Sequence, residues 1–372
     1  MQVEAKLEWS QARTLADEFS DAIKRDHPDL YREMEGIAQG SGNDVLDIVA
    51  LNVRSEIGLA TPVTPIDGCT SFGWRDSEGV QWSAQNWDWK ASAARSLVML
   101  DIRAYAPTKR PRIRMMTEAG VIGKIGTNDF GVSVMLNALK TTLRDPSYIP
   151  IHLLLRRFLE HDSVDSCLSY LSSDPILSRC ASAAHVLVTD PTKSVSIETL
   201  PTGSHVREQG KVEVQRTSSE TGQLQVETVD SGQWVGHTNH LLWTREATES
   251  LAWPDSVPRF SLLCQLVSDL VEAVNSDANR KVPEDDKEPG TPSSFELIRS
   301  RVLSDRSLGP KGICRDEAEE PDGSGGVVTV FSIVVRHGEA GSTGLGRRGK
   351  GVRTEVKIGR PDLDGEIIAF ES

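Results

Sequence analysis

Asp67-Gly68-Cys69-Thr70-Ser71 and Gln85-Asn86-Trp87-Asp88 are the two stretches that decide the fold of this chain. From Cys69 onward the pattern of side chains alternates with a period of two. Residues 69–74 and 80–86 flank Asp76-Ser77-Glu78-Gly79, a sequence typical of a turn. We therefore expect a β-hairpin, in which antiparallel pairing brings Asp88 level with the start of the first strand, beside Cys69.

The Gly68-Cys69 bond is a candidate cleavage site. If the chain were cut there, Cys69 would carry both a thiol, with a pKa of about 8.5, and an α-amine, with a pKa of about 7.7–8.0. The neutral amine could then take the thiol proton, as in an N-terminal nucleophile. Gly68 suits a cut site because it tolerates strained backbone and leaves its carbonyl open to attack. The alternative is a buried Cys that packs as a small hydrophobe, next to a turn glycine.

Helical and extended patterns alternate in blocks. The first fifty-five residues read as helices, with Leu15, Phe19 and Ile23 on one face and Asn43 or Asp44 as a cap. An α+β fold follows, a four-layer αββα sandwich of two antiparallel sheets covered by helices on both outer faces. Residues 203–232 read as an exposed hairpin and 281–293 as a polar loop. Further helices are expected over 150–159, 163–172, 257–275 and 294–304, and further strands over 96–104, 112–117, 131–136, 184–189, 194–199, 327–335, 352–358 and 366–370.

Composition excludes several classes of protein. The 372 residues carry 41 Lys and Arg against 54 Asp and Glu, a net charge of −13, which argues against nucleic-acid or anionic-membrane partners. No apolar run is long enough to span a membrane, and the N-terminus lacks the pattern of a secretory signal. Five scattered Cys do not form a disulfide framework. We therefore expect an intracellular, cytoplasmic protein, with the peroxisome as the alternative, although the C-terminal Phe370-Glu371-Ser372 is not a Ser-Lys-Leu type of peroxisomal signal.

Several separated segments carry a resemblance to a known family. They are Asp67-Gly68-Cys69-Thr70-Ser71, Gln85-Asn86-Trp87-Asp88, Thr117-Glu118-Ala119-Gly120-Val121-Ile122-Gly123-Lys124-Ile125-Gly126, Asn137-Ala138-Leu139, His237-Thr238-Asn239-His240, Ile313-Cys314-Arg315 and, more weakly, Gly359-Arg360-Pro361. In order and spacing the chain resembles the fungal acyl-coenzyme A:6-aminopenicillanic acid acyltransferase (isopenicillin N acyltransferase) family of N-terminal-nucleophile hydrolases.

The resemblance implies a fold, a processing step and a site. It implies the αββα N-terminal-nucleophile hydrolase fold and self-cleavage before Cys69 into a helical α subunit, 1–68, and a catalytic β subunit, 69–372, which together form one domain. It also implies a role for each matched residue: Cys69 as nucleophile, Asp88 as the carboxylate that orients the α-amine, Asn239 as oxyanion donor, Arg315 as active-site guanidinium and Ser71 as the hydroxyl near the cut.

Several of these residues also have a purely structural interpretation. Asp88 could be a surface residue at a strand end, and Arg315 could only neutralise its acidic neighbours; otherwise its charge could favour a thiolate or bind a substrate carboxylate. Glu118 is given no role. His237 and His240 lie three residues apart with no third ligand nearby, so we expect structural histidines and no metal site.

The expected activity is transfer of an acyl group, through a thioester on Cys69, to an amine or to water. The partners would be a small-molecule acyl donor, with a coenzyme A thioester as co-substrate and no bound cofactor, an amine acceptor, and the chain's own two fragments. One alternative is a pure N-acyl amide hydrolase like penicillin V acylase or acid ceramidase; another is an uncleaved, inactive homologue. The chain begins later than the penicillin enzyme and has an additional polar stretch over 203–232, so the substrate does not carry over.

Overall fold

The structure is a computed structural model. It describes residues 7–59, 68–103, 110–174, 176, 179–209, 212–217, 224–229, 233–245, 247, 249, 254–278, 293–317, 326–338 and 352–371.

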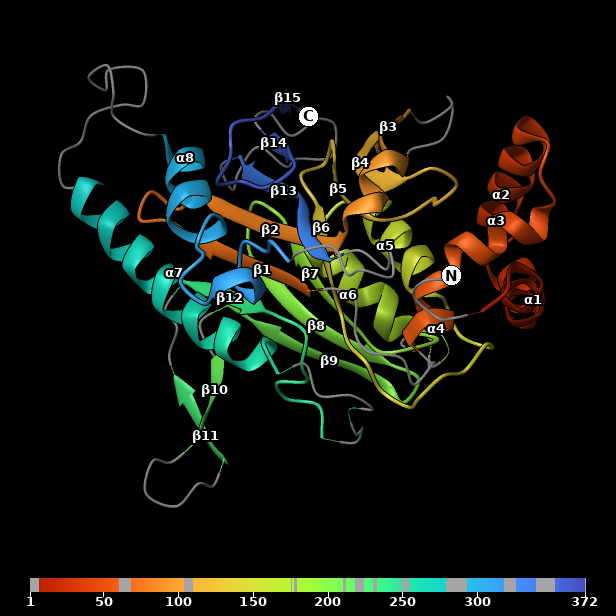
Figure 1. The fold of residues 1–372 in the computed structure, drawn as a ribbon, viewed down its shortest axis with the longest axis horizontal. Helices are drawn as coiled ribbons and strands as arrows, with labels where there is room; N and C mark the ends of the chain where they lie inside the picture. The colour runs from red at the N-terminus through yellow and green to blue at the C-terminus, as the bar shows by residue number, and fades with distance from the viewer. Residues whose placement is uncertain are drawn as a thin grey trace.

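Two antiparallel sheets form the centre of the molecule (Figure 1). The six-stranded sheet has the order β12 (Trp234–His237), β1 (Gly68–Arg75), β2 (Gln81–Lys90), β13 (Val327–His337), β14 (Arg353–Ile358), β15 (Ile367–Glu371). The seven-stranded sheet runs in sequence order through β3 (Leu97–Ile102), β4 (Ile113–Glu118), β5 (Ile125–Asn128), β6 (Ser133–Ala138), β7 (Ala184–Thr189), β8 (Ser194–Leu200) and β9 (Gly203–Glu208). A separate pair consists of β10 (Val212–Thr217) and β11 (Leu224–Val229).

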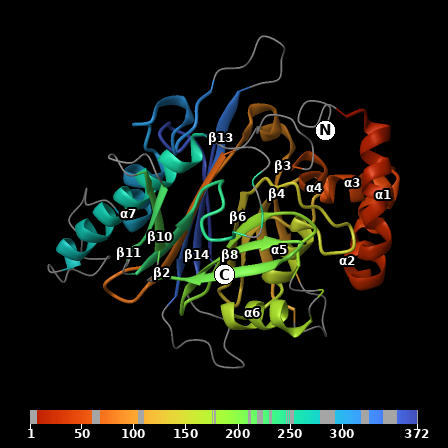
Figure 2. The same ribbon diagram turned by 90° about the horizontal axis from the view of Figure 1, so that it is seen from below.

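Helices cover the outer faces of the two sheets, which confirms the expected αββα sandwich (Figure 2). Helix α7 (Ser256–Ala278) packs on β1 and β12, with α8 (Ser294–Ile298) and a π turn (Arg299–Leu303) beside it. Helix α5 (Ile151–Leu159) packs on β5, β6 and β7 of the other sheet, and α6 (Val164–Ser173) follows it. The N-terminal helices are α1 (Trp9–Asp26), α2 (Pro28–Ser41), α3 (Val45–Asn52) and α4 (Arg54–Leu59), and short 3-10 turns occur at Ala91–Ser96 and Gly309–Lys311.

The predicted hairpin between β1 and β2 is confirmed, and its turn is closed as the sequence suggests. The Asp76 carboxylate accepts hydrogen bonds from the backbone N–H groups of Glu78 and Val80. Gly79 has a φ of 82°, a left-handed conformation that glycine adopts without steric cost. The turn therefore fixes the register in which the site is built.

Some elements differ from the sequence-based expectation. Strand β5 was not predicted, because it has only four residues and contains Gly126; β12 was likewise not expected. Within 203–232, β9 joins the seven-stranded sheet as an edge strand, and only β10 and β11 form a separate hairpin. The predicted loop at 281–293 lies outside the described residues except for Ser293, which forms the expected capping box with Glu296.

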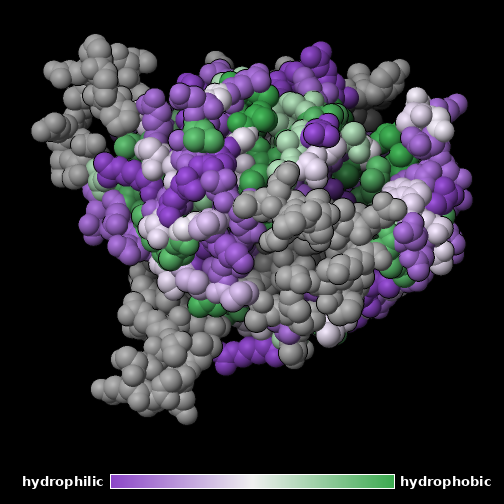
Figure 3. Space-filling model, in the orientation of Figure 1, coloured by the Kyte–Doolittle hydropathy of each residue, from purple (hydrophilic) through white to green (hydrophobic). Residues whose placement is uncertain are grey.

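One hydrophobic core lies between the sheets and continues into the N-terminal helices. It includes Phe19 and Met34 from those helices, Leu154 from α5, and Cys69 and Trp87 from the hairpin. A second core lies between α7 and the six-stranded sheet. On the face in Figure 3, hydrophilic residues dominate and hydrophobic residues gather over its upper middle part.

Among the described helices, none is both long enough and apolar enough to cross a membrane.

Candidate active site

The register of the central hairpin places the predicted residues together. Asp88 lies directly opposite Gly68, and Trp87 lies opposite Cys69. Residues paired in this way project their side chains to the same face of the sheet. The Asp88 carboxyl therefore lies on the face that α7 covers, while the side chains of Cys69 and Trp87 lie on the face toward the second sheet. All four residues are buried.

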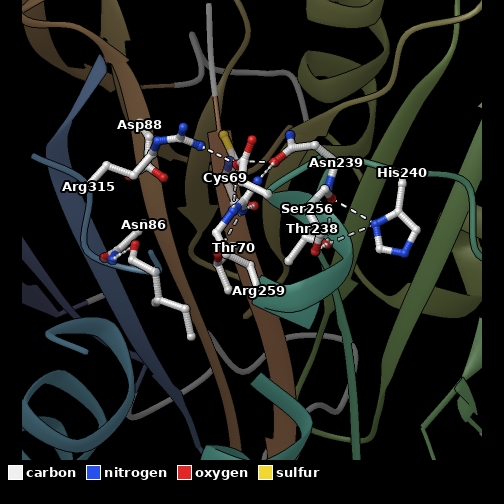
Figure 4. A network of polar contacts seen from close by, with 12 residues as sticks. Cys69, Thr70, Asn86, Asp88, Thr238, Asn239, His240, Ser256, Arg259 and Arg315 are labelled. Carbon is white, nitrogen blue, oxygen red and sulfur yellow. Dashed lines mark hydrogen bonds and ion pairs between the residues drawn. The ribbon is translucent and has the colours of Figure 1, made fainter. Parts of the chain in front are cut away.

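The backbone of Cys69 is held by two side chains that come from distant parts of the sequence (Figure 4). Its N–H donates a hydrogen bond to Asn239 Oδ1 at 2.8 Å. Its carbonyl oxygen accepts one from Arg259 Nη1 at 2.9 Å. The N–H and the C=O of Cys69, the residue that follows the candidate cleavage site, are therefore both held by side chains.

Arg259 is a site residue that the sequence reasoning missed. It lies in the first turn of α7, fully buried, and its Nη2 also donates to Asn239 Oδ1 at 2.8 Å. A signal was present in the sequence, since Arg259, Leu263 and Val267 recur every fourth residue on one helix face. A cation on the apolar face of a helix needs a buried partner, and here Asp255 supplies one at 3.1 Å.

Both the oxygen and the nitrogen of the Asn239 side-chain amide form hydrogen bonds in this structure. While Oδ1 accepts from Cys69 and Arg259, Nδ2 donates to the carbonyl oxygen of Ala138 at 3.0 Å. Its backbone N–H donates to Ser256 Oγ at 2.7 Å. The segments 137–139 and 237–240, which the sequence shows as separate motifs, are thus joined by the hydrogen bond from Asn239 to Ala138.

The Asp88 carboxyl is buried and only half satisfied. Thr329 Oγ1 donates to Oδ1 at 2.7 Å, whereas Oδ2 has no hydrogen-bond partner among the described residues. Burial raises the pKa of Asp88 to about 7, against the opposing effect of the Arg315 and Arg259 charges. An unpartnered carboxylate oxygen at 0% exposure is costly, and it marks a place where a donor is expected.

Arg315 packs against the candidate cleavage site. Its guanidinium forms ion pairs with Asp255 at 2.7 Å and Glu317 at 2.6 Å. The same group fills the space that a Cβ at Gly68 would occupy. The φ of Gly68 lies outside the left-handed region, so it does not have the strained backbone that we expected; instead, any larger residue at this position would have to displace the Arg315 guanidinium. Arg315 is thus both paired with an acidic neighbour and in contact with the candidate site.

The remaining predicted residues connect the hairpin to the second sheet. Ser71 Oγ donates to Asn137 Oδ1 at 2.6 Å, two residues beyond Cys69 and on the same face of the strand. His237 Nε2 bonds to Glu198 at 3.0 Å, and His240 Nδ1 bonds to Ser256 Oγ at 2.7 Å. In the part of the chain that the structure describes, no group of three or more His, Cys, Asp or Glu is arranged to hold a metal ion.

These observations define a class of protein. The fold is a sandwich of two antiparallel sheets between helices, with a buried cysteine at the start of its central hairpin, the architecture expected of N-terminal-nucleophile hydrolases. The family model described as acyl-coenzyme A:6-aminopenicillanic acid acyl-transferase matches residues 74–292, more than half of the chain, and the chain belongs to this family. The match begins just after Cys69 and Ser71.

The chain is also similar to individual proteins. The chain is 28% identical over 367 residues to the acyl-coenzyme A:6-aminopenicillanic-acid-acyltransferase 40 kDa form of Emericella nidulans, covering 98% of this chain and 85% of the relative. Among solved structures, penicillin V acylase from Agrobacterium tumefaciens aligns with a TM-score of 0.39 and 13% identity, over 82% of this chain and 86% of that one. The N-acylethanolamine-hydrolyzing acid amidase ortholog of Caenorhabditis elegans aligns with a TM-score of 0.42 and 16% identity, over 72% and 92%.

Proposed function

We propose that the chain cleaves itself between Gly68 and Cys69, and that Cys69 then carries an acyl group as a thioester and passes it to an amine or to water. Family membership supports acyl transfer as the reaction class. The 28% identity to an enzyme whose name includes acyl-coenzyme A supports a coenzyme A thioester as acyl donor.

One observation carries this proposal: the buried, unpartnered Oδ2 of Asp88 directly across the hairpin from Gly68. Cleavage would convert the amide nitrogen of Cys69 into an ammonium group with three donors. Asn239 Oδ1 already accepts from this nitrogen. The Asp88 carboxylate belongs to the cross-strand partner of Gly68, the residue that cleavage separates from this nitrogen. The new positive charge would lower the pKa of Asp88 and keep it ionised, so that it orients the amine.

The proposed reaction begins when the α-amine of Cys69, in its neutral form, takes the thiol proton and Sγ attacks the carbonyl carbon of the acyl donor. The tetrahedral intermediate places negative charge on the former carbonyl oxygen, which needs a fixed donor. We assign this role to Asn239, whose Nδ2 would exchange its bond to the Ala138 carbonyl for one to the oxyanion. Collapse expels coenzyme A, which leaves as a thiol by taking that proton from the α-ammonium, and the thioester remains on Cys69. An incoming amine or water then attacks this thioester and restores the thiol. Arg259 would act as a positioning residue, since it holds both Asn239 and the carbonyl of Cys69.

The same proposal requires that the two fragments stay together after cleavage. Contacts between them support this. The Asn52 side chain donates to the carbonyl of Gly120 and accepts from the N–H of Ile122, at 2.8 and 2.9 Å. Glu56 accepts from the N–H of Ile151 at 2.6 Å. Because the hydrophobic core also runs through both fragments, separating them would expose apolar surface, and we expect a stable heterodimer of 1–68 and 69–372.

An assay of purified protein with acyl-coenzyme A donors tests the activity. Free thiol release is measured with and without amines, and amide product is measured by mass. We expect release, with part of the acyl group diverted into amide, because a pocket that holds the amine and partly excludes water lets it compete. Thiol release that no amine diverts would make the protein a hydrolase. No release from any donor, together with cleavage of simple N-acyl amides, would remove coenzyme A from the reaction.

A further inference from the structure

A buried cluster of charges lies on the other side of the Cys69 strand from Asp88. Lys124 Nζ hydrogen-bonds to Glu118 Oε2, and Arg54 Nη1 lies 2.5 Å from Glu118 Oε1. The Lys124 side chain is only 1% exposed. The three residues come from α4, the end of β4 and the segment before β5, and the mechanism above gives none of them a role.

The ring of Trp87 connects this cluster to Cys69. Lys124 Nζ lies 3.5 Å from the centre of that ring. Trp87 is the direct cross-strand partner of Cys69, so the two side chains project to the same face at a Cβ separation of about 4.5–5.5 Å. The Lys124 amine therefore lies on the face that the Cys69 thiol occupies, whereas Asp88 lies on the opposite face.

The balance of charge in the cluster favours a lysine that loses its proton easily. Arg54 and Lys124 both pair with Glu118, so among these three residues two cations face one carboxylate. Burial lowers the pKa of Lys124 well below its ordinary value, Arg54 lowers it further, and Glu118 and an ionised Cys69 oppose the shift. His152, which also faces the cluster, stays neutral, because burial and the charges of Arg54 and Lys124 lower its pKa to about 3.

The uncleaved chain lacks the base that the mature site would use. Before cleavage the nitrogen of Cys69 is an amide and donates its hydrogen to Asn239, so it cannot accept the thiol proton. Self-cleavage of the precursor therefore needs a different base, which the mature enzyme does not need. We propose, building on the self-cleavage proposed above, that Lys124 is this base: its neutral amine takes the Cys69 thiol proton in the precursor.

The steps balance without any external reagent other than water. The proton moves from Cys69 Sγ to Lys124 Nζ, and Sγ forms a bond to the carbonyl carbon of Gly68. The bond from that carbon to the Cys69 nitrogen breaks, and the nitrogen takes the proton back from the Lys124 ammonium. Water then hydrolyses the thioester, which leaves a Gly68 carboxylate, restores the Cys69 thiol and releases one proton to the new α-amine.

Two substitutions at Lys124 separate a base from a simple positive charge. Lys124→Met removes both, and Lys124→Arg keeps the charge but cannot give up its proton at working pH. Purified precursor is followed over time by denaturing electrophoresis and mass. We expect both variants to cleave about 10²-fold more slowly than wild type, the lower end of a general-base effect. Lys193→Met, in a surface ion pair with Asp165, is the control and should cleave normally.

The pH dependence distinguishes a base from a residue needed only for folding. Cleavage by the wild type should accelerate as pH rises and Lys124 loses its proton. Arg54→Met removes a cation that lowers the pKa of Lys124, so its rate profile should be displaced to higher pH. Wild-type cleavage rates in Lys124→Arg, or an unshifted profile in Arg54→Met, would overturn the inference. If the wild type itself stays intact, the proposed self-cleavage is wrong. If the wild type and the Lys124 variants cleave at the same rate, self-cleavage stands and only the role of Lys124 is wrong.

Discussion

Replacing Cys69 with alanine is expected to leave a single uncleaved chain without transferase or hydrolase activity. The sulfur is the nucleophile of both proposed reactions, and alanine has no group that can form an acyl intermediate. The loss should be complete rather than partial, because Cys69 is the residue to which the covalent intermediate is attached. Denaturing electrophoresis and an acyl-coenzyme A assay on the same preparation measure both effects.

Cys264→Ala is the matched control for this experiment. Cys264 lies on α7 and is half-buried, and its substitution should leave both cleavage and turnover largely intact. Normal turnover by Cys69→Ala would move the chemistry to another residue. Because Cys69 is small and buried, alanine should keep the fold, and thermal unfolding of the variant checks this.

Asn239→Ala is expected to lower kcat by about 10²–10³, which corresponds to about 2.7–4 kcal/mol of lost oxyanion stabilisation. Substrate binding should change less, since the donor is needed mainly in the transition state. Steady-state kinetics on protein that has already been cleaved separate this effect from slower processing. The exposed Asn43 provides a control, Asn43→Ala, that should leave kcat unchanged.

A second consequence of Asn239→Ala distinguishes it from a general loss of structure. The substitution removes the acceptor for Arg259 Nη2 and for the Cys69 N–H. Arg259→Met loses the contact between Arg259 and Asn239 from the other side, so kcat, KM and thermal stability are compared between these two variants. A fall in kcat that is larger in Asn239→Ala than in Arg259→Met supports a donor to the oxyanion. Unchanged kcat in cleaved Asn239→Ala would contradict the assignment.

The sheets and the hairpin could be predicted from the sequence because their signals are local. The period-two pattern after Cys69 and the turn at 76–79 are sufficient to set the register that pairs Gly68 with Asp88. Helices α1 to α3 and α5 to α7 likewise follow from periodicity and caps, such as Asp44 at the start of α3. Short strands such as β5 and β12 were missed because four residues carry too little pattern.

The polar contacts of the site could not be predicted in the same way, because they depend on packing between distant segments. Arg259 is 190 residues from Cys69 in sequence and reaches it only once α7 lies on β1. Lys124 stands within a segment that was noted in the sequence, yet its position over Trp87 needs the sheets to face each other. The reason for Gly68 also changed, from backbone strain to the space taken by the Arg315 guanidinium.

The mass of the purified wild-type protein under denaturing conditions tests the central claim, cleavage between Gly68 and Cys69, most directly. We expect two pieces, one of 68 residues and one of the remaining 304 of the 372. N-terminal sequencing of the larger piece should begin Cys-Thr-Ser, and both pieces should migrate together under native conditions. A single intact chain in a preparation that shows acyl transfer or amide hydrolysis would contradict the account.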